Sequence, residues 1–113
     1  MKQIKAIVRP HVFSRVVHAL HELPHFPGLT VIDALGQGRG RGEGGEFILT
    51  EESLFFHRNK LIEMVAPDDL AEQIVGLIQK NAHTGAHGDG VIMVTEISQC
   101  LRIRTDEQAG AAL

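Results

Sequence analysis

Residues 61–97 read LIEMVAPDDLAEQIVGLIQKNAHTGAHGDGVIMVTEI, and this stretch decides the predicted fold. The apolar run 61–66 ends at Pro67 and predicts a strand, and the run 91–97 predicts another. Between them, apolar residues recur at helical spacing up to residue 82, and Asp68 stands where a helix N-cap belongs. The stretch therefore predicts a strand–helix–strand unit with a glycine-rich segment after the helix.

The N-terminal third of the chain shows the same order of elements. Residues 2–10 alternate between apolar and polar side chains and end in a proline, which predicts a strand. A predicted helix follows, ended by Pro24, and residues 29–35 predict the next strand. One face of that helix is apolar and holds Phe13, Val16, Val17 and Leu20. The order β-α-β, loop, β-α-β predicts an α+β, ferredoxin-like fold whose sheet carries both helices on one face and needs a cover on the other.

Length and composition exclude several classes of protein. The 113 residues predict a single domain, 1–113, and the net charge of −3 argues against general nucleic-acid binding. A lone cysteine, Cys100, makes neither an internal disulfide nor a multi-thiolate zinc site. The chain has no apolar run near the roughly 18–20 residues that span a bilayer and no leader-peptide pattern, so we expect a cytoplasmic protein.

A long loop, residues 36–59, separates the second and third predicted strands. Its first ten residues, GQGRGRGEGG, hold six of the chain's twelve glycines. The match to G-x-G-x-x-G within it does not indicate a dinucleotide fold, because no parallel strand–helix–strand unit follows. The pattern leaves a solvated flexible loop open, but loops this long are usually functional, and docking on a partner fits best.

The second glycine cluster, at residues 85, 88 and 90, lets successive backbone N–H groups point at one anion. Arg102 and Arg104 alternate with Leu101 and Ile103, which places both guanidinium groups on one side of an extended segment. Two such arginines are usually solvated, but beside a glycine cluster they form a phosphate clamp. The spacing alone leaves both interpretations open.

Together these residues resemble the PII signal-transduction family. The segments that carry the resemblance are Thr84–Val94 (TGAHGDGVIMV) and Leu101–Thr105 (LRIRT). Arg9-Pro10 at the end of the first strand, Gly28–Val31, Gly36–Arg39 and Ile62–Asp69 agree as well. The resemblance covers essentially the whole chain, including the length of the loop.

The resemblance implies a ferredoxin-like homotrimer that binds adenine nucleotides (ADP, AMP or ATP) in the clefts between subunits. The long loop 36–59 is then the T-loop, which docks on a target protein, and we assign Arg41, Phe47 and Glu52 to the docking surface. The implied function is a non-enzymatic regulator of a membrane transporter or a cytoplasmic enzyme. A transporter target would recruit the protein to the inner membrane.

The resemblance also implies a role for individual residues of the nucleotide site. Thr30 matches a position that contacts adenine, Ile7 and Val65 match positions that line the base or ribose, and Glu63 matches a glutamate beside the nucleotide. The positions that match phosphate-binding residues are Gly38 and Arg39 at the base of the T-loop, Gly88, Asp89 and Gly90 in the second glycine cluster, and Arg102 and Arg104 from the neighbouring subunit.

Four positions depart from the family pattern. Gly40 replaces the glutamine that helps to bind magnesium and 2-oxoglutarate, and Asn59 replaces the lysine that pairs with 2-oxoglutarate. Val91 replaces a phosphate-binding lysine, and Glu52 replaces the modifiable tyrosine. We therefore expect a divergent, PII-like protein that does not bind 2-oxoglutarate, with room for another small anion at the loop base and a reduced advantage of ATP over ADP and AMP.

Seven histidines raise the question of a metal site. His18 and His21 lie opposite the apolar face of the first predicted helix, and His25 would share their side, although Pro24 ends the helix before it. His83 and His87 flank the second glycine cluster. We predict no physiological metal site, because a closed site needs further ligands. His87 is instead assigned to the nucleotide site, where a ring N–H near phosphate partly substitutes for the missing lysine.

The sequence leaves two alternatives to a nucleotide-sensing regulator. The histidines are the only support for a trimeric divalent-metal-binding protein of the cation-tolerance type. An enzyme is disfavoured, because the sequence shows no Ser-His-Asp motif and no carboxylate pair, and Cys100 lies in an apolar setting.

Overall fold

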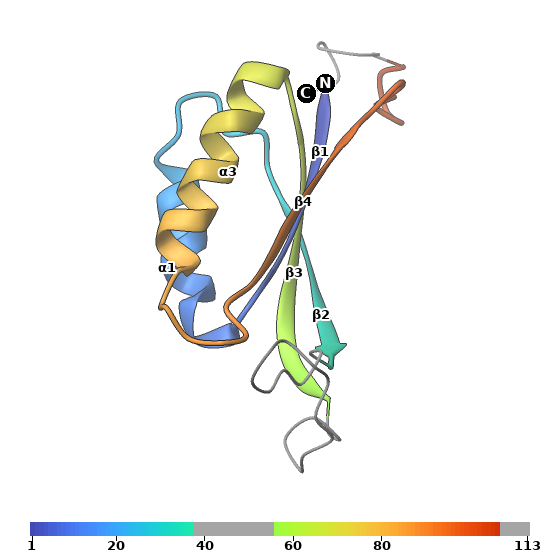
Figure 1. The fold of residues 1–113 in the computed structure, drawn as a ribbon. Coiled ribbons are helices and arrows are strands. Elements are labelled where there is room, and N and C mark those ends of the chain that lie inside the picture. The colour runs from blue at the N-terminus through green and yellow to red at the C-terminus, as the bar shows by residue number, and fades with distance from the viewer. Residues whose placement is uncertain (38–55, 107–113) are drawn as a thin grey trace.

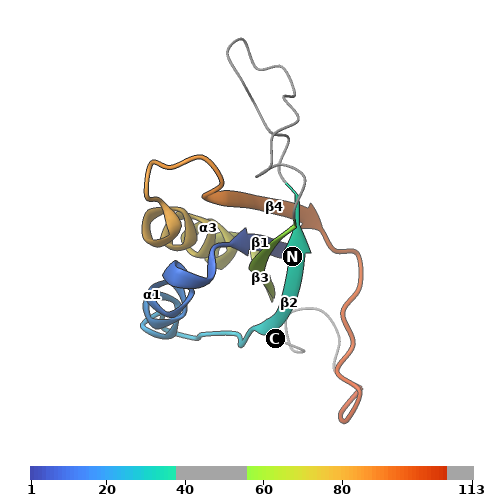
Figure 2. The same ribbon diagram turned by 90° about the horizontal axis from the view of Figure 1, so that it is seen from below.

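The structure, a computed structural model, describes residues 1–37 and 56–106. Its elements are β1 (Lys2–Val8), α1 (Pro10–His21), β2 (Thr30–Gly36), β3 (His57–Ala66), α3 (Asp68–Ala82) and β4 (Gly90–Glu96). They form one antiparallel sheet in the order β2-β3-β1-β4, and both helices lie on the same face of it (Figures 1 and 2). This is the ferredoxin-like α+β order, and the predicted fold class is confirmed.

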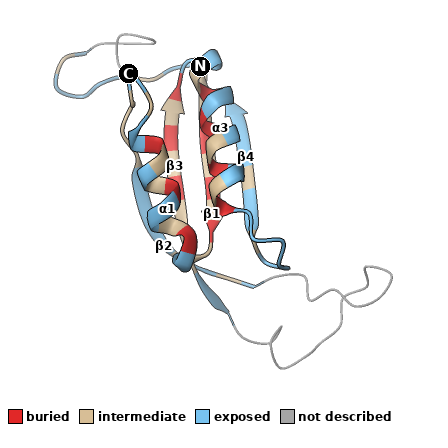
Figure 3. Ribbon diagram, turned by 90° about the vertical axis from the view of Figure 1, so that its left-hand side faces the viewer, coloured by how far each residue is buried: buried red, intermediate tan, exposed pale blue. Residues whose placement is uncertain are grey.

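The core lies between the sheet and the two helices. Alternate residues of β1 and β3 point to the helices and are buried, as the red segments of Figure 3 show. Each helix contributes one apolar stripe at the spacing of a 3.6-residue period. The buried residues are Ile4, Ala6 and Val8 in β1, Ile62, Met64 and Ala66 in β3, Val12, Val16 and Leu20 in α1, and Ala71, Ile74, Ile78 and Ala82 in α3.

The opposite face of the sheet, here called the open face, carries no helix. Residues paired across antiparallel strands share a face, so the register places Ile32, Leu61, Ile7 and Val91 in one apolar row across all four strands. The two ends of this row are open to solvent, since Ile32 is 45% and Val91 51% exposed. The open face therefore has the apolar character that the sequence predicted for a surface in need of a cover.

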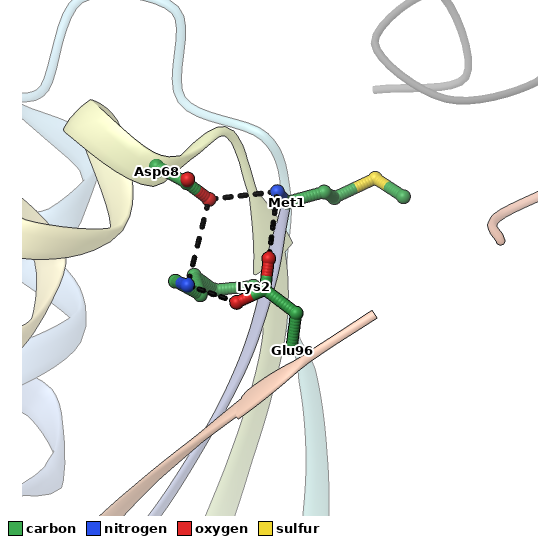
Figure 4. Close-up of polar contacts among 4 residues, drawn as sticks. All are labelled: Met1, Lys2, Asp68 and Glu96. Atoms are coloured by element: carbon green, nitrogen blue, oxygen red, sulfur yellow. Dashed lines mark hydrogen bonds and ion pairs between the residues drawn. The ribbon is translucent and has the colours of Figure 1, made fainter. Parts of the chain in front are cut away.

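The sequence predicted Asp68 as the N-cap of α3, and this prediction is wrong. Pro67 occupies the N-cap position, and Asp68 is the first helical residue. Its carboxylate accepts a hydrogen bond of 2.7 Å from the N-terminal amine of Met1, and this bond holds the pKa of Asp68 below its usual value. Lys2 and Glu96 form a second ion pair beside it (Figure 4). Asp68 thus joins the start of α3 to the start of β1, because a chain terminus offers a stronger donor than a backbone N–H.

The C-terminal arginine segment also differs from its prediction. The sequence indicated an extended stretch over residues 101–105, but residues 103–105 form a turn. The N–H of Asp106 donates to the carbonyl oxygen of Arg102 at 2.9 Å, and Asp106 adopts a φ of 59°. Ile103 is 96% exposed, so its alternation with the arginines has no sheet to pack against and does not hold the segment extended.

Neither of the two helices in the described residues is long and apolar enough to cross a membrane. The loop between the second and third strands lies where the sequence predicted it, but its end was predicted wrongly: β2 ends at Gly36 and β3 begins at His57, so residues 57–59 belong to β3. Gly38, Arg39, Arg41, Phe47 and Glu52, which were assigned to this loop, lie outside the described residues.

Candidate functional site

The glycine loop, residues 83–90, connects the end of α3 to β4 and is organised by one carboxylate. Asp89 accepts hydrogen bonds from the backbone N–H groups of Thr84 and Gly85, at 2.7 and 2.9 Å, and a third from the Thr84 hydroxyl. The same hydroxyl accepts a bond of 3.2 Å from the N–H of Ala86. The loop is therefore closed from within before any ligand arrives.

These contacts fix the charge of Asp89. The hydrogen bond from the Thr84 side chain is the largest cause, the backbone bonds and the positive charge of His83 add to it, and together they lower the pKa of Asp89 to about 2. The carboxylate is ionised at neutral pH and satisfied by the donors of its own loop. Asp89, which was predicted to bind the nucleotide, thus shapes the loop.

Two glycines of the loop combine a left-handed backbone with a close neighbour, which is backbone at Gly90 and the Arg9 side chain at Gly88. Gly90 has a φ of 113°, and a Cβ at this position would lie 1.8 Å from the carbonyl oxygen of Ile7. Gly88 has a φ of 92°, and a Cβ there would lie 2.1 Å from a terminal nitrogen of Arg9. The close approach of β1 and the left-handed backbone both require glycine.

Arg9 holds the glycine loop from outside and was not among the predicted site residues. It follows β1 directly, and its Nε donates to the carbonyl oxygen of Gly88 at 2.6 Å. In the sequence, Arg9-Pro10 contributed only to the family resemblance. Contact between residues 79 positions apart leaves no local pattern to find.

A pocket of about 460 Å³ opens beside the glycine loop. Three predicted site residues line it: Ile7, Asp89 and Gly90. Val91 and His83 line it too, together with apolar side chains of α3 that include Val75 and Ile78. The volume is in the range of ordinary small-molecule sites, and the lining combines apolar walls with a polar rim.

Three further predicted residues meet on the open face. Thr30 of β2 pairs with Glu63 of β3, and Val65 lies two residues farther along the same strand. Glu63 also makes an ion pair of 3.8 Å with Lys5 on β1. Ile7 shares this face through its pairing with Leu61, so the adenine and ribose positions predicted from the resemblance lie on one surface.

The remaining predicted residues do not all come together within one chain. His87 is exposed in the glycine loop. The C-terminal segment that carries Arg102 and Arg104 follows β4, whereas the glycine loop precedes it, so the two lie at opposite ends of that strand (Figure 1). A site that uses both therefore needs a second copy of the chain.

The histidines do not assemble a metal site in the described part of the chain. Nowhere in residues 1–37 and 56–106 do three or more histidine, cysteine, aspartate or glutamate side chains lie close enough to hold a metal ion. His21 stacks on Phe26 with 4.4 Å between ring centroids, and α1 ends at His21, before His25.

Comparison with known proteins gives full-length matches. The family model described as nitrogen regulatory protein P-II matches residues 1–107. The chain is similar to nitrogen regulatory protein P-II of Azospirillum brasilense, at 41% identity over 113 residues and 100% of both chains. It is 40% identical to the protein of that name from Rhodospirillum rubrum and 37% identical to nitrogen regulatory protein P-II 1 of Escherichia coli strain K12, again over 100% of both chains.

Proposed function

The chain belongs to the nitrogen regulatory protein P-II family, and on this premise we propose that it is a signal-transduction regulator that senses adenine nucleotides. Proteins of this family are effector-binding regulators, and the relatives found here are named as regulatory proteins. One observation carries the finer proposal: a glycine loop held by Asp89 and Arg9 leads directly into Val91, which pairs with Ile7 on the open face. Such a loop offers backbone N–H groups to an anion without first having to be ordered.

The phosphates belong at the glycine loop and the base at the open face. Gly88 and Gly90 face the anion, and Thr30, Glu63 and Val65 supply the surface for adenine and ribose. Gly38, Arg39 and His87 make further contacts with the phosphates. No carboxylate pair or nucleophile is needed for this role, so we propose a protein that binds and does not transform its ligand.

We propose a homotrimer whose protomers cover each other's open faces. The apolar row across the sheet supplies the driving force, because burying exposed apolar area contributes roughly 25 cal/mol per Å². In the trimer, Arg102 and Arg104 of one protomer reach the glycine loop of the next. This arrangement resolves the separation of the two halves of the site at opposite ends of β4.

The loop between β2 and β3 is the proposed docking element. The targets that we propose are a membrane transporter or a cytoplasmic enzyme, contacted through Arg41, Phe47 and Glu52. Asn59 of β3 holds a neutral amide next to Gly36, with its Nδ2 3.0 Å from where a Cβ of Gly36 would be. With no ammonium at this position, we propose that 2-oxoglutarate does not bind.

The test is a calorimetric titration of the wild-type chain with ATP, ADP, AMP, 2-oxoglutarate and divalent metal ions in turn. We expect saturable binding of the nucleotides and no heat from 2-oxoglutarate in the presence of ATP and magnesium. Saturable metal binding without any nucleotide binding would instead support the cation-tolerance alternative. Micromolar binding of 2-oxoglutarate would show that the loop base is aligned wrongly.

A further inference from the structure

The side chain of Arg9 is placed against the glycine loop by the strand and the helix on either side of it. Val8 pairs with Gly90 across β1 and β4, so Arg9 leaves the sheet level with the last turn of the loop. Pro10 begins α1 directly after it and fixes the direction of the chain at this point. The side chain of Arg9 then crosses to Gly88 and donates its Nε to the carbonyl oxygen at 2.6 Å.

The guanidinium group lies against the loop itself. One terminal nitrogen stands 2.1 Å from where a Cβ of Gly88 would be, and the central carbon of the group stands 3.0 Å from it. The planar group therefore covers the side of Gly88 that any other residue would fill with its side chain. This close fit places a permanent positive charge on the surface of the loop.

The loop has no lysine or arginine of its own. Its sequence is HTGAHGDG, and the next residue, Val91, is apolar. Its one carboxylate, Asp89, is occupied by donors from Thr84 and Gly85. A guanidinium group has five N–H donors, of which the bond to Gly88 uses the one on Nε. The donors on the terminal nitrogens match the oxygens of a phosphate group.

We propose that Arg9 is a specificity-determining residue of this site and that its terminal nitrogens bind the phosphates of the nucleotide while Nε holds Gly88. The inference rests on the proposed function and assigns to it a residue from the far end of the chain. The bond from Nε turns the guanidinium before the ligand binds, so less side-chain entropy is lost on binding. Binding then depends on the charge of Arg9 as well as on the loop that it holds.

The experiment compares three variants with the wild type by calorimetric titration with ADP, ATP and adenosine. Arg9→Gln removes the charge, and Arg9→Lys keeps the charge but loses the planar fork. Arg15→Gln is the matched control, because Arg15 also donates its Nε to a backbone carbonyl, that of Asn81, at 2.7 Å. Thermal unfolding checks that each variant is folded.

Arg9→Gln should weaken the binding of ADP and ATP by about tenfold or more, which is the loss expected for one hydrogen bond between charged groups. Its affinity for adenosine should stay within about twofold of the wild-type value. Arg9→Lys should fall between Arg9→Gln and the wild type, and its affinity for ADP should stay sensitive to salt, whereas that of Arg9→Gln should lose part of this sensitivity. Arg15→Gln should bind like the wild type.

Equal losses for adenosine and ADP would overturn the proposal, because they would show that Arg9 only holds the loop. Unchanged ADP affinity in Arg9→Gln would overturn it as well. If Arg9→Gln does not fold, Arg9→Lys decides by the same comparison of ADP with adenosine. A wild-type chain that binds none of the nucleotides overturns the proposed function itself, which separates that failure from an error about Arg9 alone.

Discussion

Asp89 is the residue on which the geometry of the glycine loop depends. Its side chain accepts donors from Thr84 and Gly85, and these bonds favour the ionised form, which lowers the pKa to about 2 from an ordinary 3.8. A carboxylate with a lowered pKa stabilises the folded state above its unfolded pKa and loses that contribution as the pH falls through the folded one. The contribution of Asp89 to stability is thus complete well above pH 3.8 and is lost as the pH falls toward 2.

Asp89→Asn should therefore lower the free energy of unfolding at pH 7, and the difference from the wild type should narrow between pH 5 and pH 3. Denaturant titrations at several pH values measure this difference. Glu72→Gln is the control, because it removes an exposed carboxylate from the outer side of α3. A difference that stays constant down to pH 3 would contradict the assignment of these bonds to the ionised carboxylate.

Under the proposed function, Val91 weakens binding of the outer phosphates of the nucleotide. It is 51% exposed beside the glycine loop, where an ammonium would reach the phosphate end of the site. We expect ATP to bind less than about tenfold more tightly than ADP in the wild type, a difference below 1.4 kcal/mol. Val91→Lys should strengthen the binding of ATP more than that of ADP or AMP, by roughly tenfold, through one charge-assisted hydrogen bond.

Competition titrations of ATP against ADP and AMP measure this preference. Val94→Lys is the matched control: Val94 lies on the same strand and is 45% exposed, but it pairs with Ile4 and so belongs to the helix-bearing face. An equal gain from both lysines would show that general charge, and not position 91, governs the preference.

At the scale of elements, the start of β4 is fixed by backbone contact. Gly90→Ala should reduce the free energy of unfolding by at least about 2 kcal/mol, because it combines a left-handed backbone with a Cβ pressed onto Ile7. Gly76→Ala is the control in α3, where nothing lies within 4 Å of the added Cβ. It should stabilise the chain by about 0.5–1 kcal/mol. If Gly90→Ala has no more effect than Gly76→Ala, the register of β1 and β4 is wrong.

The elements that the sequence predicted well are those with a strong periodicity. The stripes of α1 and α3 and the alternation in β1 fix a helix or a strand by themselves, because each has one face to bury. The alternation in residues 101–105 has the same form, but it makes only a single β-bridge, at Leu101, and residues 103–105 form a turn. Periodicity predicts an element only where a surface exists to receive its apolar face.

In the candidate site, too, local patterns could be predicted and contacts between distant residues could not. The glycine loop was predictable because each left-handed position needs its own glycine, and three stand in one short segment. The contacts of Arg9 and Asp68 could not be predicted, because each is made with a residue far along the chain. Arg9 donates to Gly88, and Asp68 accepts from the amine of Met1. Contacts of this kind are set by the register of the sheet, which the local sequence does not contain.

At the scale of the whole molecule, the open face calls for other copies of the chain. Ile32 is 45% exposed at one end of the apolar row, so an interface between protomers would bury it. Ile32→Asp should dissociate the trimer, because an unpaired carboxylate costs several kcal/mol to bury. Gln73→Asp, on the exposed side of α3, should leave the assembly intact. Light scattering measures both masses, and a monomeric wild type would contradict the trimer.

The affinity of the Arg102→Ala variant for ADP tests the central claim most directly. In the proposed trimer, one ADP per chain lies between the glycine loop of one protomer and the arginines of the next. A calorimetric titration should give a stoichiometry of one for the wild type and an affinity reduced by about tenfold or more for Arg102→Ala, with the trimer preserved. An unchanged affinity in Arg102→Ala, or no ADP binding by the wild-type trimer, would contradict the account.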